Sequence, residues 1–424
     1  MRYPFLLASL ALSLAFQVCY AQNRFEVIDS DIKSVQCYTN TDIAAFPSIL
    51  LGSPDVISIE FDDLNEKAPR NLSYTITHCD EFWRDEGMFP TDFLEGFQEQ
   101  PLYNSGFSNN TAVRYTHYTI TFPNSSVKPK VSGNYLLTVM DADRQEPLLR
   151  VGFQIVENAA SQVSSIIIPN NSSYLTSQQL NLTLLYPLIN VTSPGNEIKS
   201  KVYQNYVLLP ENMQPKAISY GMNQAVYSRP DLNIYPAGNE YRRLDIRDPH
   251  YISTNANVIR QSGTGMYYIF LVPDVSRADM PYTYNDDLDG KMIISGLSQN
   301  INPATDCDYY SVLFSYKSPY LGDRFDMYID GELTGWMPTN YNKMLYNHQT
   351  GCYELTLLLK QGYYGYKYSV RDQYGVEQQD LSPEGNFSQT QNTYQVSAYY
   401  KGIRDIYTRL ISSTTLGKKP KILK

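Results

Sequence analysis

Histidine is the side chain most suited to moving protons near neutral pH, and the 424-residue chain contains only four of them. These are His78, His117, His250 and His348. No two stand at the spacing that brings two ligands or a catalytic pair together on one helix or hairpin. His78 and His117 fall in strand-like stretches whose same face also carries a tyrosine. We therefore expect hydrogen-bonded histidines in a half-buried sheet rather than catalytic bases.

Sequence patterns of activated nucleophiles and phosphate-binding loops are missing from the chain. It has no G-x-S-x-G, no H-E-x-x-H and no glycine-rich phosphate loop after a strand. Two catalytic carboxylates far apart in sequence would leave no local pattern, so this kind of hydrolase stays open. The sequence nominates no such pair. We predict a protein that is not an enzyme and has no cofactor.

One acidic loop partly matches a calcium-binding pattern. Residues 285–290, NDDLDG, place oxygen ligands at loop positions 1, 3 and 5 and glycine at position 6. Position 12 is Gly296, where a bidentate glutamate is needed. The flanking residues are typical of strands. We predict a hairpin turn with polar side chains and no metal site.

Four cysteines beyond the N-terminal segment are candidates for disulfides: Cys37, Cys79, Cys307 and Cys352. No two have the two-to-four-residue ligand spacing of a zinc site. Of the three possible pairings, only Cys37–Cys79 and Cys307–Cys352 lie within single predicted domains. An exported chain permits such bridges, although domains of this size fold without them. The sequence leaves both bridges open.

The composition favours strands over helices. The chain carries 38 Tyr, 16 Phe and 2 Trp, and only 18% of its residues are charged. Aromatic and β-branched side chains suit a pleated, half-buried surface. With 34 Lys+Arg against 43 Asp+Glu, the chain also lacks the basic excess typical of a nucleic-acid binder.

Residues 1–21 are predicted to be a secretory signal peptide. Arg2 supplies a positive charge, residues 5–16 form an apolar run, and residues 19–21 supply the cleavage site. No other segment reaches ~18 consecutive apolar residues, so we predict no transmembrane segment. The mature chain is expected to be exported to the periplasm.

Short runs with apolar residues at every second position recur along the chain and predict strands. Residues 56–61 and 72–77 alternate in this way and are predicted to be antiparallel partners joined by a longer loop. Many such runs without a helical period predict an all-β fold of tandem immunoglobulin-like or early-set β-sandwich domains.

We predict three domains after the signal peptide. Residues 22–157 form an N-terminal β-sandwich, residues 158–304 a middle β-rich domain with long loops, and residues 305–424 a C-terminal early-set-like β-sandwich with a basic tail.

The region from Pro210 to Gly265 is rich in proline, asparagine and tyrosine and is predicted to contain large irregular loops. Long loops of this kind are often functional. We therefore expect its tyrosines to contribute to a contact surface; they include Tyr220, Tyr227, Tyr235 and Tyr241.

Several segments, taken in order, resemble a known family, the plug proteins of the type IX secretion system of Bacteroidota. The segments that resemble its first domain are HCDEFW at 78–83, FLEGF at 93–97, SNNT at 108–111, YTHY at 115–118 and SGNY at 132–135. GNEYR at 238–242, YNDDLDG at 284–290 and LKQGYY at 359–364 extend the resemblance over nearly the whole mature chain.

The resemblance implies a non-enzymatic protein at the periplasmic side of the outer membrane. Such plug proteins bind the large outer-membrane β-barrel translocon of the system and close its channel. A wide barrel without a plug would be an open aqueous hole. The resemblance supplies no contact residues.

A second resemblance keeps an alternative open. Residues 330–368 resemble the early-set modules attached to glycogen- and starch-active enzymes. In that family a tryptophan and a lysine contact glucan, which corresponds here to Trp336 and Lys367. This alternative predicts a carbohydrate-binding protein.

Overall fold

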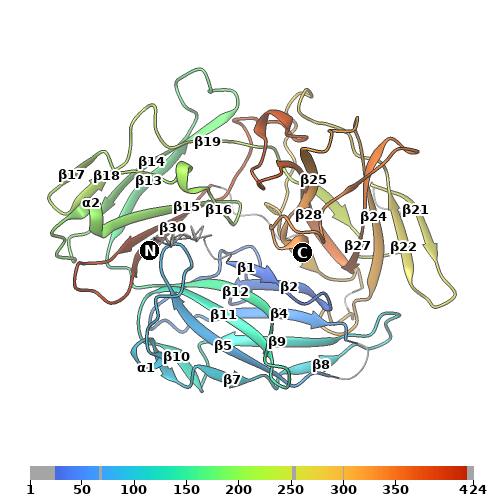
Figure 1. Cartoon of the computed structure of the whole chain (residues 1–424), viewed down its shortest axis with the longest axis horizontal. Coiled ribbons are helices and arrows are strands. Elements are labelled where there is room, and N and C mark those ends of the chain that lie inside the picture. The colour runs from blue at the N-terminus through green and yellow to red at the C-terminus, as the bar shows by residue number, and fades with distance from the viewer. Residues whose placement is uncertain (1–23, 66–68, 251–254, 299, 418–424) are drawn as a thin grey trace, which may run out of the picture.

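The computed structural model describes residues 24–65, 69–250, 255–298 and 300–417. The predicted signal peptide and the lysines of the basic tail lie outside these residues. The described chain is built almost entirely from strands (Figure 1), which confirms the all-β prediction. Its two α-helices are single turns, α1 (Pro90–Phe93) and α2 (Pro194–Glu197). Among the described residues, no helix has the length and apolar character needed to cross a membrane.

The first sandwich comprises residues 25–156 and packs two main sheets face to face. One sheet has the order β1 (Phe25–Val27), β12 (Glu146–Val156), β11 (Gly133–Asp141), β5 (Leu72–Cys79) and β7 (Glu99–Pro101), with β3 (Ser48–Leu50) parallel to β12. The other has the order β2 (Ile32–Thr39), β4 (Ile57–Asp63), β9 (Thr116–Phe122) and β8 (Ser105–Phe107). A two-stranded ribbon of β10 (Val127–Pro129) and β6 (Leu94–Gly96) closes one end.

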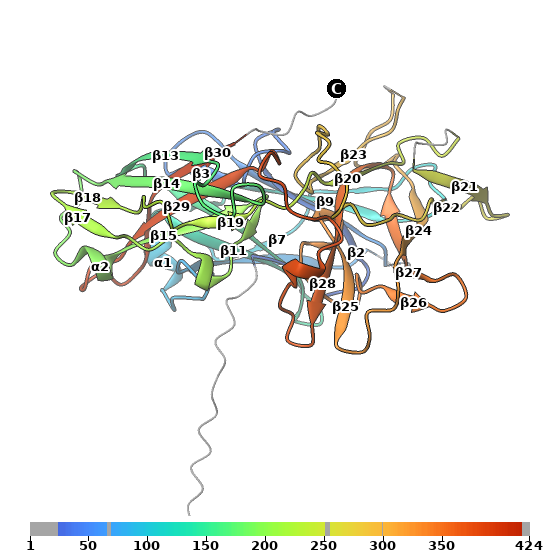
Figure 2. The ribbon, with the colours of Figure 1, turned by 90° about the horizontal axis from the view of Figure 1, so that it is seen from above.

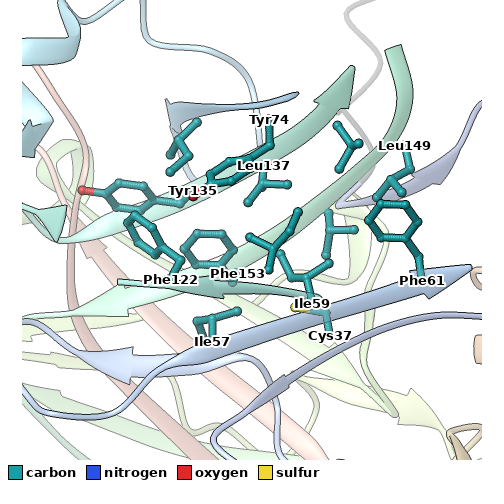
Figure 3. Packing of buried hydrophobic residues seen from close by; sticks show 14 of the residues in the cluster. Cys37, Ile57, Ile59, Phe61, Tyr74, Phe122, Tyr135, Leu137, Leu149 and Phe153 are labelled. Atoms are coloured by element: carbon teal, nitrogen blue, oxygen red, sulfur yellow. The ribbon is translucent and has the colours of Figure 1, made fainter. Parts of the chain in front are cut away.

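The strands predicted at 56–61 and 72–77 form as β4 and β5, but they do not pair with each other. β4 pairs with β2 and β9, whereas β5 pairs with β11 and β7. Ile57, Ile59 and Phe61 of β4 point into the same core as Tyr74 of β5 (Figure 3). Alternation identifies the apolar face of a strand, but it does not identify the neighbour that accepts its backbone hydrogen bonds. The predicted antiparallel pair is therefore wrong.

The second sandwich brings residues 161–236 together with residues 394–416. One sheet has the order β13 (Ser161–Ile167), β14 (Ser177–Leu185), β18 (Gln224–Val226) and β17 (Ser219–Gly221), and β19 (Ile234–Pro236) also pairs with β14. The other has the order β16 (Val207–Leu208), β15 (Ile198–Gln204), β29 (Tyr394–Tyr400) and β30 (Arg409–Leu416). The 3-10 turn η1 (Glu211–Met213) follows β16.

In sequence, the third sandwich lies between these two segments of the second. One sheet has the order β20 (Arg242–Asp245), β28 (Gly362–Asp372) and β23 (Met292–Ile294), and β25 (Phe325–Asp330) also pairs with β28. The other has the order β21 (Ala256–Gln261), β22 (Tyr267–Leu271), β24 (Tyr309–Lys317), β27 (Cys352–Lys360) and β26 (Leu345–Asn347). Two further 3-10 turns are η2 (Glu332–Thr334) and η3 (Gln379–Leu381).

The hydrophobic cores do not follow the predicted boundary between residues 304 and 305. Residues 198–204 pair along their whole length with residues 394–400, and residues 242–245 pair with residues 363–366. The third sandwich is thus inserted into the second. A strand pairing that spans almost 200 residues leaves no local signal, because each partner alternates independently of the other.

The three sandwiches pack against one another in a triangle. Figure 1 shows the first sandwich below and the other two above it, and Figure 2 shows those two side by side along the longest axis. Both sheets of the first sandwich contact a neighbour through their outer faces. Tyr399 of β29 donates its hydroxyl to Asn134 of β11, while Lys360 of β27 pairs with Asp62 of β4 at 2.7 Å.

Candidate functional surface

The two strand histidines are buried and hydrogen-bonded, as the sequence led us to expect. His78 Nε2 lies 3.0 Å from the Ser132 carbonyl oxygen, and Nδ1 lies 3.0 Å from a Glu86 carboxylate oxygen. Burial disfavours the ionised form of Glu86, but hydrogen bonds from His78, Lys401 and Thr408 outweigh it and lower its pKa to about 2. This arrangement is a buried polar anchor between the first sandwich and the strand ends of the second.

His117 belongs to a polar contact between the first and third sandwiches. Its Nδ1 lies 2.7 Å from Asp62 Oδ1. The other oxygen of Asp62 accepts from the Tyr309 hydroxyl at 2.7 Å and pairs with Lys360. One carboxylate oxygen is thus held by His117 of the first sandwich and the other by Tyr309 and Lys360 of the third. We interpret the group as an interdomain tie, because no nucleophile with an activating base accompanies it.

Neither of the two disulfides that the sequence left open is present in the structure, and all four cysteines are buried thiols. Cys307 precedes β24, while Cys352 lies opposite Lys317 at the far end of the same strand. Ten residues of strand separate these positions by roughly 30 Å, well beyond the ~6 Å Cα separation of a disulfide. Cys37 points into the first core. The even-numbered residues of β5 face that core, so Cys79, an odd-numbered residue, lies on the opposite side of the strand.

The acidic loop at 285–290 contributes two buried carboxylates, which accept hydrogen bonds from groups of the protein itself. Asp287 accepts from the backbone N–H of Asp289 at 3.0 Å and from that of Tyr241. Asp289 accepts from the Thr393 hydroxyl at 2.5 Å. Burial raises the pKa of Asp287 to about 7. Within the described ranges, no group of three or more His, Cys, Asp or Glu side chains is arranged to hold a metal ion.

Of the two residues expected to contact sugar under the alternative, Trp336 is buried and Lys367 is partly exposed beside an acidic partner. Trp336 is only 8% exposed and packs in an aromatic cluster between the sandwiches. Lys367 of β28 faces Glu377 at 3.6 Å; burial opposes its charge, but Glu377 and other neighbours raise its pKa. A glucan platform needs an exposed aromatic face, which Trp336 does not offer.

The aromatic cluster joins all three sandwiches, and we name it the aromatic junction. Its buried members are Phe46, Trp83, Tyr203, Tyr206 and Trp336. Trp83 Nε1 donates to the Tyr203 hydroxyl at 3.0 Å, and the Tyr206 hydroxyl donates to the Ala44 carbonyl at 2.5 Å. The rings of Tyr206 and Trp336 lie 5.9 Å apart. The first, second and third sandwiches each supply part of one apolar core.

The backbone of the aromatic junction is locally strained. Trp83, Tyr206 and Trp336 adopt φ values of 65°, 69° and 54°, the left-handed region that bulky side chains rarely occupy. Each such residue costs on the order of 1–3 kcal/mol and persists only where surrounding contacts hold it. A contact between sandwiches that tolerates three such residues is a rigid one.

Buried charge lies directly beside the aromatic junction. Lys291 Nζ is 2.5 Å from Glu332, with both side chains almost fully buried. The same ammonium lies 5.1 Å from the Tyr206 ring centroid and 5.7 Å from that of Trp336, within cation–π range. The pair and the rings therefore form one desolvated unit.

The tyrosines singled out in the 210–265 region are mostly core residues. Tyr227, Tyr235 and Tyr241 are buried, and only Tyr220 is exposed. Tyr227 and Tyr235 belong to the core of the second sandwich, while Tyr241 packs close to Gly290. A segment with irregular backbone can still direct its side chains into the core. The irregularity predicted for this region therefore did not indicate that its tyrosines are exposed.

A different set of aromatic residues is exposed, and we name it the aromatic strip. Its members, with their exposed fractions, are Phe89 (75%), Phe97 (82%), Tyr103 (85%) and Phe107 (67%). All four come from the short elements α1, β6, β7 and β8 and their connections, at the bottom of the first sandwich in Figure 1. Sequence reasoning missed this surface. The signal that could have found it is the run of aromatic and acidic residues without lysine or arginine at 85–107.

The fold and these surfaces define an all-β protein of three packed sandwiches with no recognisable catalytic constellation among its described residues. Residues 32–157 match the family described as type 9 secretion system plug protein, first domain. The chain belongs to this plug protein family, as its sequence motifs led us to expect. The match covers the first sandwich, including the aromatic strip.

Comparison with solved structures shows a likeness over nearly the whole chain. A hypothetical protein from Parabacteroides merdae is similar over 93% of this chain and 99% of its own, with 30% identity and a TM-score of 0.87. The C-terminal domain of the antigen I/II-family protein AspA from Streptococcus pyogenes shares 9% identity over 91% of this chain and 99% of its own, with a TM-score of 0.15. A TM-score this low does not indicate a shared fold. No curated protein matches the chain.

Proposed function

We propose that this protein binds the periplasmic side of the outer-membrane translocon of the type IX secretion system and plugs its channel without doing chemistry. The observation that carries the proposal is the family match of residues 32–157, together with a likeness over nearly the whole chain to a bacterial protein of the same fold. The secretion-system family and the all-β fold point to a non-enzymatic role.

The mechanical character of the molecule suits a plug. A plug that closes a wide pore must resist deformation, because any opening between its domains would let solutes through. The three sandwiches share the aromatic junction and are further joined by buried polar ties such as Lys360–Asp62 and Tyr399–Asn134. The chain also crosses between the second and third sandwiches twice, since one is inserted into the other. These contacts favour a single rigid body over three loosely linked domains.

The carbohydrate-binding alternative has no supporting observation in the structure. Its expected stacking residue, Trp336, is buried in the aromatic junction. We therefore advance the plug function alone.

The test is a pull-down and a permeability measurement on the same strain. Tagged mature protein is incubated with solubilised outer membranes from cells that lack their own copy, and retained proteins are identified by mass spectrometry. We expect the large barrel translocon to be retained. Cells without the protein should also admit large hydrophilic antibiotics that intact cells exclude. Repeated recovery of the tagged chain alone, with unchanged permeability, would refute the proposal.

A further inference from the structure

The aromatic strip is unusual because phenylalanine is rarely left in water at these exposed fractions. Five aromatic side chains among the described residues are more than two-thirds exposed. They are the four members of the strip and Tyr374 of the third sandwich. Four of the five such residues thus lie within 19 positions of one another, 89–107. Clustered exposed apolar surface marks interaction sites, whereas single exposed apolar residues are ordinary.

The four strip side chains are exposed, and their segment touches the neighbouring sandwiches only near its ends: Gly106 of β8 lies close to Thr305, and Glu86 accepts a hydrogen bond from Thr408. The outer faces of the two sheets of the first sandwich contact the other sandwiches, through Asn134 and Gln154 on one side and Asp62 on the other. The elements α1, β6 and β7, by contrast, lie at the end of the sandwich farthest from the other two in Figure 1. The exposed rings of the strip are therefore accessible to a partner.

The backbone holds the strip residues on short, well-anchored elements. Phe89 directly precedes α1, whose Phe93 is buried in the first core. Phe97 directly follows β6, which pairs with β10. Tyr103 lies between β7 and β8, and the intervening Leu102 is buried in the same core. Rigid presentation of aromatic rings lowers the conformational entropy lost on binding.

The charge of the strip is one-sided. Residues 85–107 contain five acidic residues and no lysine or arginine. Of these, Asp85, Asp92, Glu95 and Glu99 are exposed, while Glu86 is paired with Lys401 at 2.7 Å. Two further basic side chains beside the strip come from β10 and its end: Lys128 lies opposite Glu95, and Lys130 donates to the Thr91 carbonyl.

We propose that the aromatic strip is the surface by which this protein docks on its partner, and that the partner offers apolar pockets bordered by lysine and arginine. The inference rests on the proposed function, in which the partner is the periplasmic face of the translocon. Aromatic anchors in pockets supply most of the binding energy at protein interfaces. The acidic residues between them select a basic rim and accelerate encounter.

The experiment measures the affinity of purified protein for the solubilised translocon. The strip variants are Phe97→Ser/Tyr103→Ser and Phe89→Ser/Phe107→Ser, and the matched control is Tyr374→Ser, an aromatic residue that is 81% exposed but lies in the third sandwich. We expect each double variant to lose affinity by a factor of about 30 or more, the effect of losing a hot spot. We expect the control to bind like wild type. Glu95→Lys/Glu99→Lys should slow association and reduce its dependence on salt.

The outcomes separate this inference from the proposed function. If wild type binds the translocon and both strip variants bind equally well, the strip is not the docking surface, although the function stands. If wild type does not bind the translocon at all, both proposals fail. If sedimentation shows that wild type dimerises and the strip variants do not, the surface joins two copies of this chain and the inference is overturned. Unchanged unfolding midpoints of all variants would exclude misfolding as the cause of lost binding.

Discussion

The Trp83 indole N–H donates a hydrogen bond to the Tyr203 hydroxyl at 3.0 Å, across 120 residues of sequence. The bond joins the first sandwich to the second inside the aromatic junction, where both side chains are buried. It also helps to hold Trp83 at a φ of 65°. One contact thus links domain packing to a strained backbone.

Replacing Tyr203 with phenylalanine should destabilise the whole protein. The change keeps the ring and its contact with Phe46 but leaves the buried Trp83 N–H without its acceptor. An unsatisfied buried donor costs about 1–3 kcal/mol. Urea unfolding should show this loss. Tyr103→Phe removes a hydroxyl that is on the exposed strip and should change stability by less than about 0.5 kcal/mol. Equal effects of the two substitutions would contradict the structural role of the bond.

Removing the charge of Lys291 should have a larger effect. Lys291→Met leaves Glu332 buried without its cation, and breaking a buried pair from one side costs about 3–5 kcal/mol. Replacing both partners, as in Lys291→Met/Glu332→Leu, should recover most of this loss, because no lone charge remains in the core. Thermal unfolding of the two variants measures the difference. A double variant no more stable than the single one would show that the pair itself, rather than the lone charge, sets the stability.

The elements of the fold were largely readable from the sequence, whereas their assembly was not. The run at 56–61 formed β4 because alternate apolar residues have a core to face. Its pairing partners, the insertion of the third sandwich into the second and the distance between Cys307 and Cys352 all depend on contacts between distant segments. Alternation carries no information on such contacts.

The proposed docking surface was hidden for a related reason. Tyr235 and Phe97 both lie beside short irregular elements, yet Tyr235 is buried and Phe97 is exposed. Which of them faces water depends on what packs above each residue. The family resemblance extended over nearly the whole mature chain and supplied no contact residues, so it did not single out this surface.

The stability of the protein should fall between pH 4 and pH 7 through Asp287. Burial raises its pKa from 3.8 to about 7, so the folded state binds a proton in this range that the unfolded state has released. Stability then decreases as pH rises until it passes the folded pKa. The neighbours that face the carboxylate are Glu240, Asp289 and Arg277. Asp287→Asn should flatten this part of the stability curve.

The comparison that checks this dependence is urea unfolding of wild type and Asp287→Asn at several pH values. Asp231 lies on the surface beside Arg229, and Asp231→Asn should retain the wild-type slope between pH 5 and pH 7. A slope that is the same in all three proteins would show that Asp287 is already ionised in the folded state over this range, as it is in the unfolded state.

Labelling with a thiol reagent should distinguish free buried cysteines from cysteines joined in disulfides. Burial raises the pKa of Cys37 to about 12 and that of Cys307 to about 11, so few reactive thiolates exist at pH 8. A thiol reagent should leave the folded mature protein unmodified and should add four labels after unfolding without a reductant, one at each of Cys37, Cys79, Cys307 and Cys352. Folding itself keeps them apart: Cys307 and Cys352 lie near opposite ends of β24, and Cys37 faces the first core from β2, whereas Cys79 lies on the outer side of the other sheet. Two labels instead of four would mean that one bridge forms and that the strands carrying it are placed differently.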